Sequence, residues 1–454
     1  MLRRQPKNIV IYFLSIIILS VLFLSYISLM SNYHSLSPSS KKNLPSQTTC
    51  KQISQYGITW TFNKEYPCGR FLEGRGDWWV IGPVTITSVS PVPSNGLHGS
   101  MINPKGSNGG HAFDSRDSSY GYDSRLAVQF PSTLQPDTSL LSSISNPLTT
   151  NCQIGTSGPK GWLTYDSRRC SLSYAKTVAV LTVLNTVPPT DAFRPSYSSN
   201  TKTIYRLSQV RNDLLLNLQP PPNIPSIQTL ERQFERPWID FIGGWYGRHS
   251  HPSDNMMDYG YYMTEDLSDA ILYLQLNVPN KQILLERFLQ YGIDLEGVAL
   301  SGGYWPADGG HDSGRYVSFV TAGYLLQNPK MQYPLSWMSS PIKENNFGET
   351  CQTYFDSQNV ARWGLRYWQD PTRADWKDEL NAYRTCCTSS AWVGQALTIR
   401  LLHLDTTLER QAYLYYVDRW MIENGGTSSQ FVKDMWNKYR YDDLVIQQPK
   451  IAIP

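Results

Sequence analysis

The feature that most constrains the fold is a change in hydrophobic period at about residue 227. Before it, runs such as DWWVIGPVTITSVSP and AKTVAVLTVLNTVPP are rich in β-branched and aromatic residues and end in Gly, Pro or Ser turns, which is typical of β-strands. After it, apolar residues recur every three or four positions in at least seven segments, which is typical of amphipathic helices. The chain is therefore predicted to be multidomain, with β structure first and α structure second.

The predicted fold class is an N-terminal β-sandwich-like module followed by an α/α array of helical hairpins. TEDLSDAILYLQLN, GRYVSFVTAGYLLQ and AWVGQALTIRLLHL are among the helical segments. Thr264, followed by two acidic residues, resembles a helix N-cap. The helical segments are too few for a closed ring of hairpins, so an incomplete toroid and a plain array both stay open.

The predicted domain boundaries follow shifts in composition. The Pro-rich stretches between the two halves, such as LQPPPNIPS, mark a linker. We expect a cytosolic tail with a transmembrane signal anchor at 1–32, a polar stalk at 33–49, a β-rich module at 50–190, a linker at 191–226 and an α/α catalytic domain at 227–454.

An apolar run near the N-terminus predicts a membrane anchor. It extends from Ile9 to Met30 without a charged residue and follows Arg3, Arg4 and Lys7. As a helix it would be about 33 Å long, enough to cross the hydrocarbon core. Because positive charge precedes the run, we expect a single pass with the C-terminal bulk outside the cytosol. Cleavage of the run as a signal peptide, with secretion of the rest, is the alternative.

Seven cysteines favour an oxidising compartment and local disulfides. We expect Cys50 to pair with Cys68, Cys152 with Cys170, and Cys351 with Cys386 or Cys387. A zinc site is a poor alternative, because adjacent cysteines lack the spacing of zinc ligands. The sequence therefore predicts no metal.

The net charge and the aromatic content indicate which kinds of ligand the protein could bind. A net charge of +3 with no long basic block argues against nucleic-acid binding. The chain holds 29 Tyr and 14 Trp, and exposed aromatic rings suit flat ligands such as sugars, although large cores would use the same residues.

Three loops of the helical half concentrate reactive side chains. In a helical array such loops converge at one end, and glycines in the first two permit tight turns close to a ligand. Taken alone, each residue has a plainer role: a loop histidine usually forms ordinary hydrogen bonds, an arginine a surface ion pair, and Asp beside Gly a turn. Their joint occurrence is what suggests a site. The first loop holds Arg248, His249, His251, Asn255, Asp258, Tyr259, Tyr261 and Tyr262, the second Tyr304, Trp305, Asp308, His311, Asp312 and Arg315, and the third Tyr354, Arg362, Arg366 and Tyr367.

The order of these residues resembles the toroid-type polysaccharide lyases, most closely those that cleave alginate and glucuronan. The matching features are Asn255 in one loop, His311 in the next, and an arginine and a tyrosine in the third. NMMDYGYYMTEDLSDA, GGYWPADGGHDSGRYVSFVTAGYLL and YRTCCTSSAWVGQAL are also similar to segments of uncharacterised secreted bacterial proteins. The resemblance covers roughly Pro237 to Met421, and the β-rich half departs from single-domain members.

The resemblance implies β-elimination on an acidic polysaccharide, with no cofactor. Donors neutralise the uronate carboxylate, a base removes the C5 proton, and an acid protonates the departing O4. A tyrosine serves as base and acid if an arginine lowers its pKa; Tyr367 is the first choice, Tyr354 and Tyr304 are rivals, and neutral His311 is the other base. The implied catalytic residues are Asn255, His311, Arg315, Arg362 and Tyr367, and the implied substrate-binding residues are Arg248, His251, Tyr259, Tyr304, Trp305 and Tyr354.

Two other functions stay open. An inverting glycoside hydrolase on the same fold would use two carboxylates, Asp258 with either Asp308 or Asp312. A membrane-anchored carbohydrate-binding protein would need neither set of residues. A lyase leaves an unsaturated product that absorbs ultraviolet light, a hydrolase leaves reducing ends without that absorbance, and a binding protein leaves no product.

Overall fold

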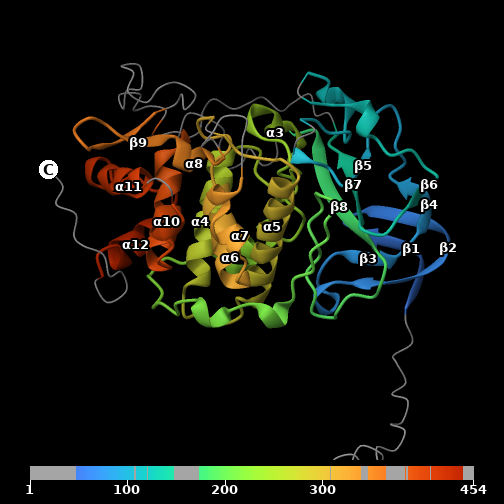
Figure 1. Cartoon of the computed structure of the whole chain (residues 1–454), viewed down its shortest axis with the longest axis horizontal. Coiled ribbons are helices and arrows are strands. Elements are labelled where there is room, and N and C mark those ends of the chain that lie inside the picture. Colours follow the sequence, from blue (N-terminus) through green and yellow to red (C-terminus); the bar gives the residue numbers. More distant parts are fainter. Residues whose placement is uncertain are drawn as a thin grey trace, which may run out of the picture. The chain divides into compact units, whose positions relative to one another are not determined.

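A computed structural model describes residues 48–106, 109–119, 121–147, 173–306, 308–338, 346–364, 384, 387–408 and 411–442 (Figure 1). From Thr49 onward the described residues belong to one compact unit. No helix in these ranges is long and apolar enough to span a membrane. The predicted anchor at Ile9 to Met30 lies outside the described residues, as do Cys152, Cys170, Cys386, Arg366 and Tyr367.

The N-terminal half is a curled, mixed sheet of eight strands (Figure 1). The order is β5-β7-β8-β3-β2-β4-β6, and β1 pairs with β2 outside that path. β3 and β8 run parallel, and the other pairs are antiparallel. The strands are β1 (Thr49–Gln55), β2 (Ile58–Arg70), β3 (Trp78–Ile81), β4 (Val84–Ser90), β5 (Ser100–Ile102), β6 (Ser132–Leu134), β7 (Thr138–Ser145) and β8 (Ala175–Leu184).

The predicted β-sandwich is therefore wrong, although β structure in this half is confirmed. Strand β2 is the reason. Its first part pairs with β1 and β4 and its last part with β3, so one 13-residue strand joins what would otherwise be two sheets. A hydrophobic pattern locates strands but does not say which strands pair, and a bend within a long strand leaves no mark in that pattern.

The two faces of the sheet enter different cores. Along β8, Ala179 and Leu181 belong to a core confined to the sheet, while Val178 and Val180 belong to the large core that contains the helices. Alternate residues of a strand point to opposite faces, so β8 is buried on both sides. The sheet is therefore packed directly against the helical half.

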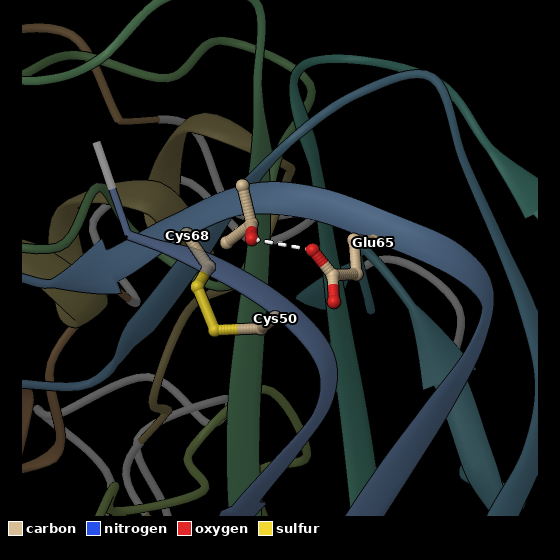
Figure 2. The surroundings of a disulfide bond; sticks show 4 residues. Cys50, Glu65 and Cys68 are labelled. Carbon is tan, nitrogen blue, oxygen red and sulfur yellow. Dashed lines mark hydrogen bonds between the residues drawn. A yellow bond between two sulfur atoms is a disulfide. The ribbon is translucent and has the colours of Figure 1, made fainter. Parts of the chain in front are cut away.

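A disulfide between Cys50 and Cys68 joins β1 to β2 (Figure 2), as the sequence predicted. Beside it the Thr49 hydroxyl donates to the Glu65 carboxylate at 2.7 Å. The predicted pairing of Cys351 is wrong, because among the described cysteines Cys351 is a buried thiol. Cys387 does form a disulfide.

The C-terminal half contains ten described α-helices and a small hairpin (Figure 1). The helices are α2 (Ile227–Gln233), α3 (Gly244–Ser250), α4 (Gly260–Leu274), α5 (Gln282–Leu300), α6 (Arg315–Leu326), α7 (Pro329–Gln332), α8 (Gly348–Cys351), α10 (Ser389–Leu401), α11 (Ala412–Glu423) and α12 (Gln430–Tyr439). The hairpin pairs β9 (Thr353–Phe355) with β10 (Ala361–Trp363).

Short 3₁₀ turns occur in both halves, at Leu72–Gly74, Ser115–Asp117, Ser124–Leu126, Leu207–Gln209, Asn212–Leu214, Pro334–Ser336 and Asp405–Thr407.

The helices predicted from periodicity are confirmed as a class, but not as a toroid. α4 packs against α10, α5 against α2 and α6, and α12 against α4 and α10. These contacts describe a packed array, and the described helices form no closed ring.

The predicted start of α4 is also wrong. Thr264 lies inside the helix, and its hydroxyl donates to the Gly260 carbonyl at 2.6 Å instead of capping the first turn. The N-cap is Tyr259, five residues earlier than predicted, and Gly260, the first residue of the helix, packs directly on the loop before α6. A Cβ added to Gly260 would lie 2.0 Å from the His311 carbonyl oxygen.

Candidate functional site

The candidate site forms where α3 meets the loop that precedes α6. Gly244 begins α3 with a φ of +66° and donates its amide to Asp312 Oδ1 at 2.7 Å. A Cβ on Gly244 would lie 3.2 Å from Asp308 Oδ2. Glycine at this position therefore supplies a left-handed backbone conformation and leaves room for two carboxyl groups at the start of the helix.

His311 is enclosed by aromatic rings from two other elements. Its ring centroid is 5.3 Å from that of Trp245 and 4.8 Å from that of Tyr259, both edge to face. The guanidinium of Arg248 lies over the same two rings, 4.8 Å from the Trp245 centroid and 4.9 Å from the Tyr259 centroid. Trp245 is 40% exposed, so this cluster has one side open to solvent. We refer to these four side chains as the His311 cluster.

Burial and charge keep the His311 imidazole neutral. Desolvation, with smaller effects of Arg248 and Arg315, lowers the pKa of His311 to about 3. Nδ1 of His311 has no hydrogen-bond partner among the described residues, and neither does Nε of Arg248. A neutral imidazole and an uncommitted cationic N–H therefore lie in one cluster.

The neighbouring carboxyl groups respond to burial in the opposite direction. Desolvation raises the pKa of Asp312 to about 7, and it also raises the pKa of Asp308. Glu349 Oε1 accepts from the Tyr316 amide at 2.9 Å at the start of α6, and burial raises its pKa to about 7. Carboxylic acids that hold a proton near neutral pH are candidate general acids.

Arg315 is buried, and its side chain binds other groups of the protein. The side chain is 1% exposed and pairs with Asp240, with Nη2 at 2.7 Å from Oδ1 and Nε at 3.0 Å from Oδ2. Nη1 donates to the His311 and Ser313 carbonyls, and Nη2 also reaches the sulfur of Met263. All five N–H groups are thus occupied within the protein, and Arg315 fixes the loop that carries His311.

Asn255 is also engaged elsewhere. Its Nδ2 donates to the main-chain carbonyls of Gln233 and Arg236, at 2.9 and 3.1 Å. The side chain lines a separate cavity of about 500 Å³ with residues of α2 and the turn before Asn255. The Asn255 side chain therefore contacts α2 and the segment after it, and it is not part of the His311 cluster.

Arg362 and Tyr354 face each other on the hairpin, directly paired in the register of β10 and β9. Arg362 Nε donates to Asp356 at 2.8 Å. The pKa of Tyr354 is raised by burial, a larger effect than the lowering by Arg362. The hairpin contacts α11, and Gln352 just before it donates to the Gly309 carbonyl at 2.9 Å. The hairpin is therefore anchored to the loop that carries His311.

The other predicted binding residues divide between core and site. Trp305 is fully buried, stacks on Phe347 at 5.4 Å and donates to the Asp240 carbonyl, so its ring is unavailable for stacking on a sugar. His251 is 2% exposed, with Nδ1 2.9 Å from the Met257 carbonyl. Burial lowers the pKa of His251 to about 4. Tyr304 is half-buried beside Gly243.

The sequence analysis missed a contribution from the β-rich half. His111 Nε2 lies 2.6 Å from Asp117 Oδ2, and both side chains are fully buried. Asp117 Oδ1 lies 3.7 Å from His249 Nδ1, and the His249 ring contacts Trp245 at 6.2 Å. The Gly-rich stretch GSNGGHAFDSRD carried the same kind of signal as the three chosen loops. Its place in a predicted β module concealed it.

The part of the chain that the structure describes contains no group of three side chains suited to hold a metal ion. Comparisons with family models, with curated proteins and with solved structures found no match.

Proposed function

We propose that the protein is a carbohydrate-active enzyme, a lyase that cleaves a uronic-acid polysaccharide by β-elimination at the His311 cluster. The observation that carries the proposal is the gathering of a neutral imidazole, a phenol and a guanidinium beside a partly exposed indole. β-Elimination requires a base, an acid and a cation, and an aromatic platform suits a sugar ring.

The cluster supports the following assignment of roles. Arg248 donates to the uronate carboxylate and stabilises the charge that develops when C5 loses its proton. His311 accepts the C5 proton, the C4–O4 bond breaks as the C4=C5 double bond forms, and Tyr259 protonates O4. Trp245 packs against the sugar. Tyr259 thus takes the part first given to Tyr367, which lies outside the described residues and stays a rival.

Arg315 and Arg362 keep supporting parts in this proposal, and Asn255, whose amide donates to Gln233 and Arg236, has none. The Asp240–Arg315 pair fixes the His311 loop through its carbonyl contacts. The toroid of the resembling lyases stays a proposal for the complete helical half, as does the role of Arg362 on a hairpin tied to Gly309.

An inverting hydrolase is the second candidate, and the raised pKa of Asp308 is the observation that favours it. A protonated Asp308 would serve as general acid. Asp258, 3.3 Å from Arg248, would be the partner carboxylate that activates water.

The experiment is a depolymerisation screen of the full-length protein against alginate, glucuronan, heparan-type and pectic chains. We expect one of them to give ultraviolet-absorbing products together with new reducing ends. Reducing ends without absorbance would identify a hydrolase, and no product from any chain would contradict an enzymatic function on these substrates.

We also propose that the enzyme is anchored by Ile9 to Met30 with its bulk outside the cytosol. The Cys50–Cys68 disulfide supports an oxidising compartment. Protease added to intact cells is expected to remove most of the chain, and full protection would exclude this topology.

A further inference from the structure

A second cavity, of about 270 Å³, lies between the β2–β3 connection, the segment that follows α2, and helix α5. It shares no lining residue with the His311 cluster. This volume lies just below the roughly 300–1,000 Å³ that is usual for ligand pockets, so a ligand here has to be small, of monosaccharide size at most. Its lining combines aromatic rings, arginines and carboxylates.

Two residues of the cavity lining have a positive φ. Tyr56, in the β1–β2 turn, has a φ of +52°, and Leu72, in the β2–β3 connection, has a φ of +50°. Side chains other than Gly or Asn rarely adopt this region. At Tyr56 a positive φ is the ordinary conformation of the two-residue turn between β1 and β2, so Leu72 is the residue of this pair that marks strained backbone.

On the floor of the cavity, arginines and carboxylates pair with one another. Arg194, 1% exposed, donates to Asp77 at 2.5 Å and to both oxygens of Asp294 at 2.8 and 2.5 Å. Glu286 on the same lining pairs with Arg75. The carboxylates still hold lone pairs that accept from hydroxyl groups, and they would repel a second negative charge on a ligand.

The mouth of the cavity carries two arginines with spare donors. Arg70 donates to the Gly76 and Arg75 carbonyls, and Arg287 donates to the Glu231 carbonyl. Neither forms an ion pair within the described residues. Both guanidinium groups are more exposed than the floor, so their remaining N–H groups are free to bind a carboxylate.

We propose that this cavity binds a small monoanionic sugar acid. The carboxylate lies at Arg70 and Arg287, the hydroxyl groups face the acidic floor, and the ring packs against Tyr56, the half-buried aromatic residue of the lining. A neutral sugar leaves the two cations uncompensated, and a phosphate dianion is opposed by the floor. This binding does not depend on the catalysis proposed above.

The test is calorimetric titration of the full-length protein with glucuronate, glucose and inorganic phosphate. We expect saturable binding of glucuronate, no measurable binding of glucose and weaker binding of phosphate. Arg287→Gln removes a charge-assisted hydrogen bond and should weaken glucuronate binding about tenfold or more. Arg211→Gln is the matched control, since Arg211 forms an exposed pair with Asp213 away from the cavity.

Two further variants make the result decisive. Ile283→Trp fills the cavity from an exposed position on α5 without changing charge, and it should also weaken binding. Ile422→Trp, at an exposed position on α11 that does not line the cavity, should leave binding unchanged. Absence of glucuronate binding, equal binding of glucose, tighter binding of phosphate, or full binding in both cavity variants overturns the proposal. Unchanged melting temperatures confirm that the variants are folded.

Discussion

His311 and Tyr259 are the side chains on which the proposed chemistry depends. His311→Ala and Tyr259→Phe should each lower turnover of a cleaved uronan about 100-fold or more, the usual effect of losing a proton-transfer group. Asp308→Asn should change it only a few-fold, since the lyase assigns no proton transfer to that carboxyl. Steady-state kinetics on the three variants give the ranking, and the hydrolase alternative predicts the reverse order.

Asp240 holds the loop of the proposed base in place through Arg315. Asp240→Asn leaves a buried guanidinium without its counter-charge, and we expect the free energy of unfolding to fall by about 3–5 kcal/mol. Asp213→Asn, which breaks an exposed pair, should cost no more than about 1 kcal/mol. Urea denaturation of both variants tests the difference, and equal losses would contradict a structural role for Asp240.

Glu349 gives a prediction about pH. Burial raises its pKa from the ordinary 4.5 to about 7, so folding favours the protonated form. The resulting stability is present below about pH 4.5 and is lost as the pH rises toward 7. His251 and His311, whose pKa values are lowered, act in the opposite sense over part of this range. The prediction therefore concerns the difference in unfolding free energy between the parent protein and a variant that lacks the Glu349 carboxyl.

Glu349→Gln removes this titration and keeps an acceptor for the Tyr316 amide. Between pH 4.5 and 7, the parent protein should lose about 2–3 kcal/mol relative to the variant. Urea midpoints measured at several pH values supply the comparison. A constant difference across the range would show that Glu349 titrates normally.

Arg315 shows why the site could be foreseen only in part. The density of polar residues around His311 drew attention to this loop, and the structure places His311 beside Tyr259 and Arg248, two other residues that the sequence singled out. Whether an arginine faces a substrate or a buried carboxylate depends on its partner, and Asp240 lies 75 positions away. No local pattern reveals such a pair.

The first residue of α4, Gly260, packs against the loop that carries His311, so a larger residue there should disturb the loop. In Gly260→Ala the new Cβ would meet the His311 and Gly310 carbonyls at 2.0 and 2.4 Å, so the loop must move. We expect a loss of about 1–3 kcal/mol in stability and of most activity. Gly426→Ala, whose Cβ would make an ordinary 3.4 Å contact, is the control. Melting temperature and turnover should be measured for both variants. Equal losses of stability and activity in the two variants would contradict this account.

Strands and helices were foreseen where their period was clear, and their assembly was not. The periods of β8 and α4 follow from local sequence, whereas the pairing of β2 with three strands depends on distant partners. The early start of α4 has the same origin, because Gly260 is fitted to a loop that comes fifty positions later in the chain. Tertiary contacts decide such cases.

Over the whole molecule, one core joins the sheet to the helices. The His111–Asp117 pair comes from the β-rich half and reaches His249 of α3. The two halves thus meet close to the His311 cluster, which explains why a site predicted from helical loops alone was incomplete.

The most direct test of the proposed β-elimination is the mass of any product that the full-length protein releases from a defined uronate oligosaccharide. We predict a new non-reducing end that is lighter by one water than the hydrolysis product, with its formation abolished in His311→Ala. A product with the full mass of added water, or release unaffected by His311→Ala, would contradict the account.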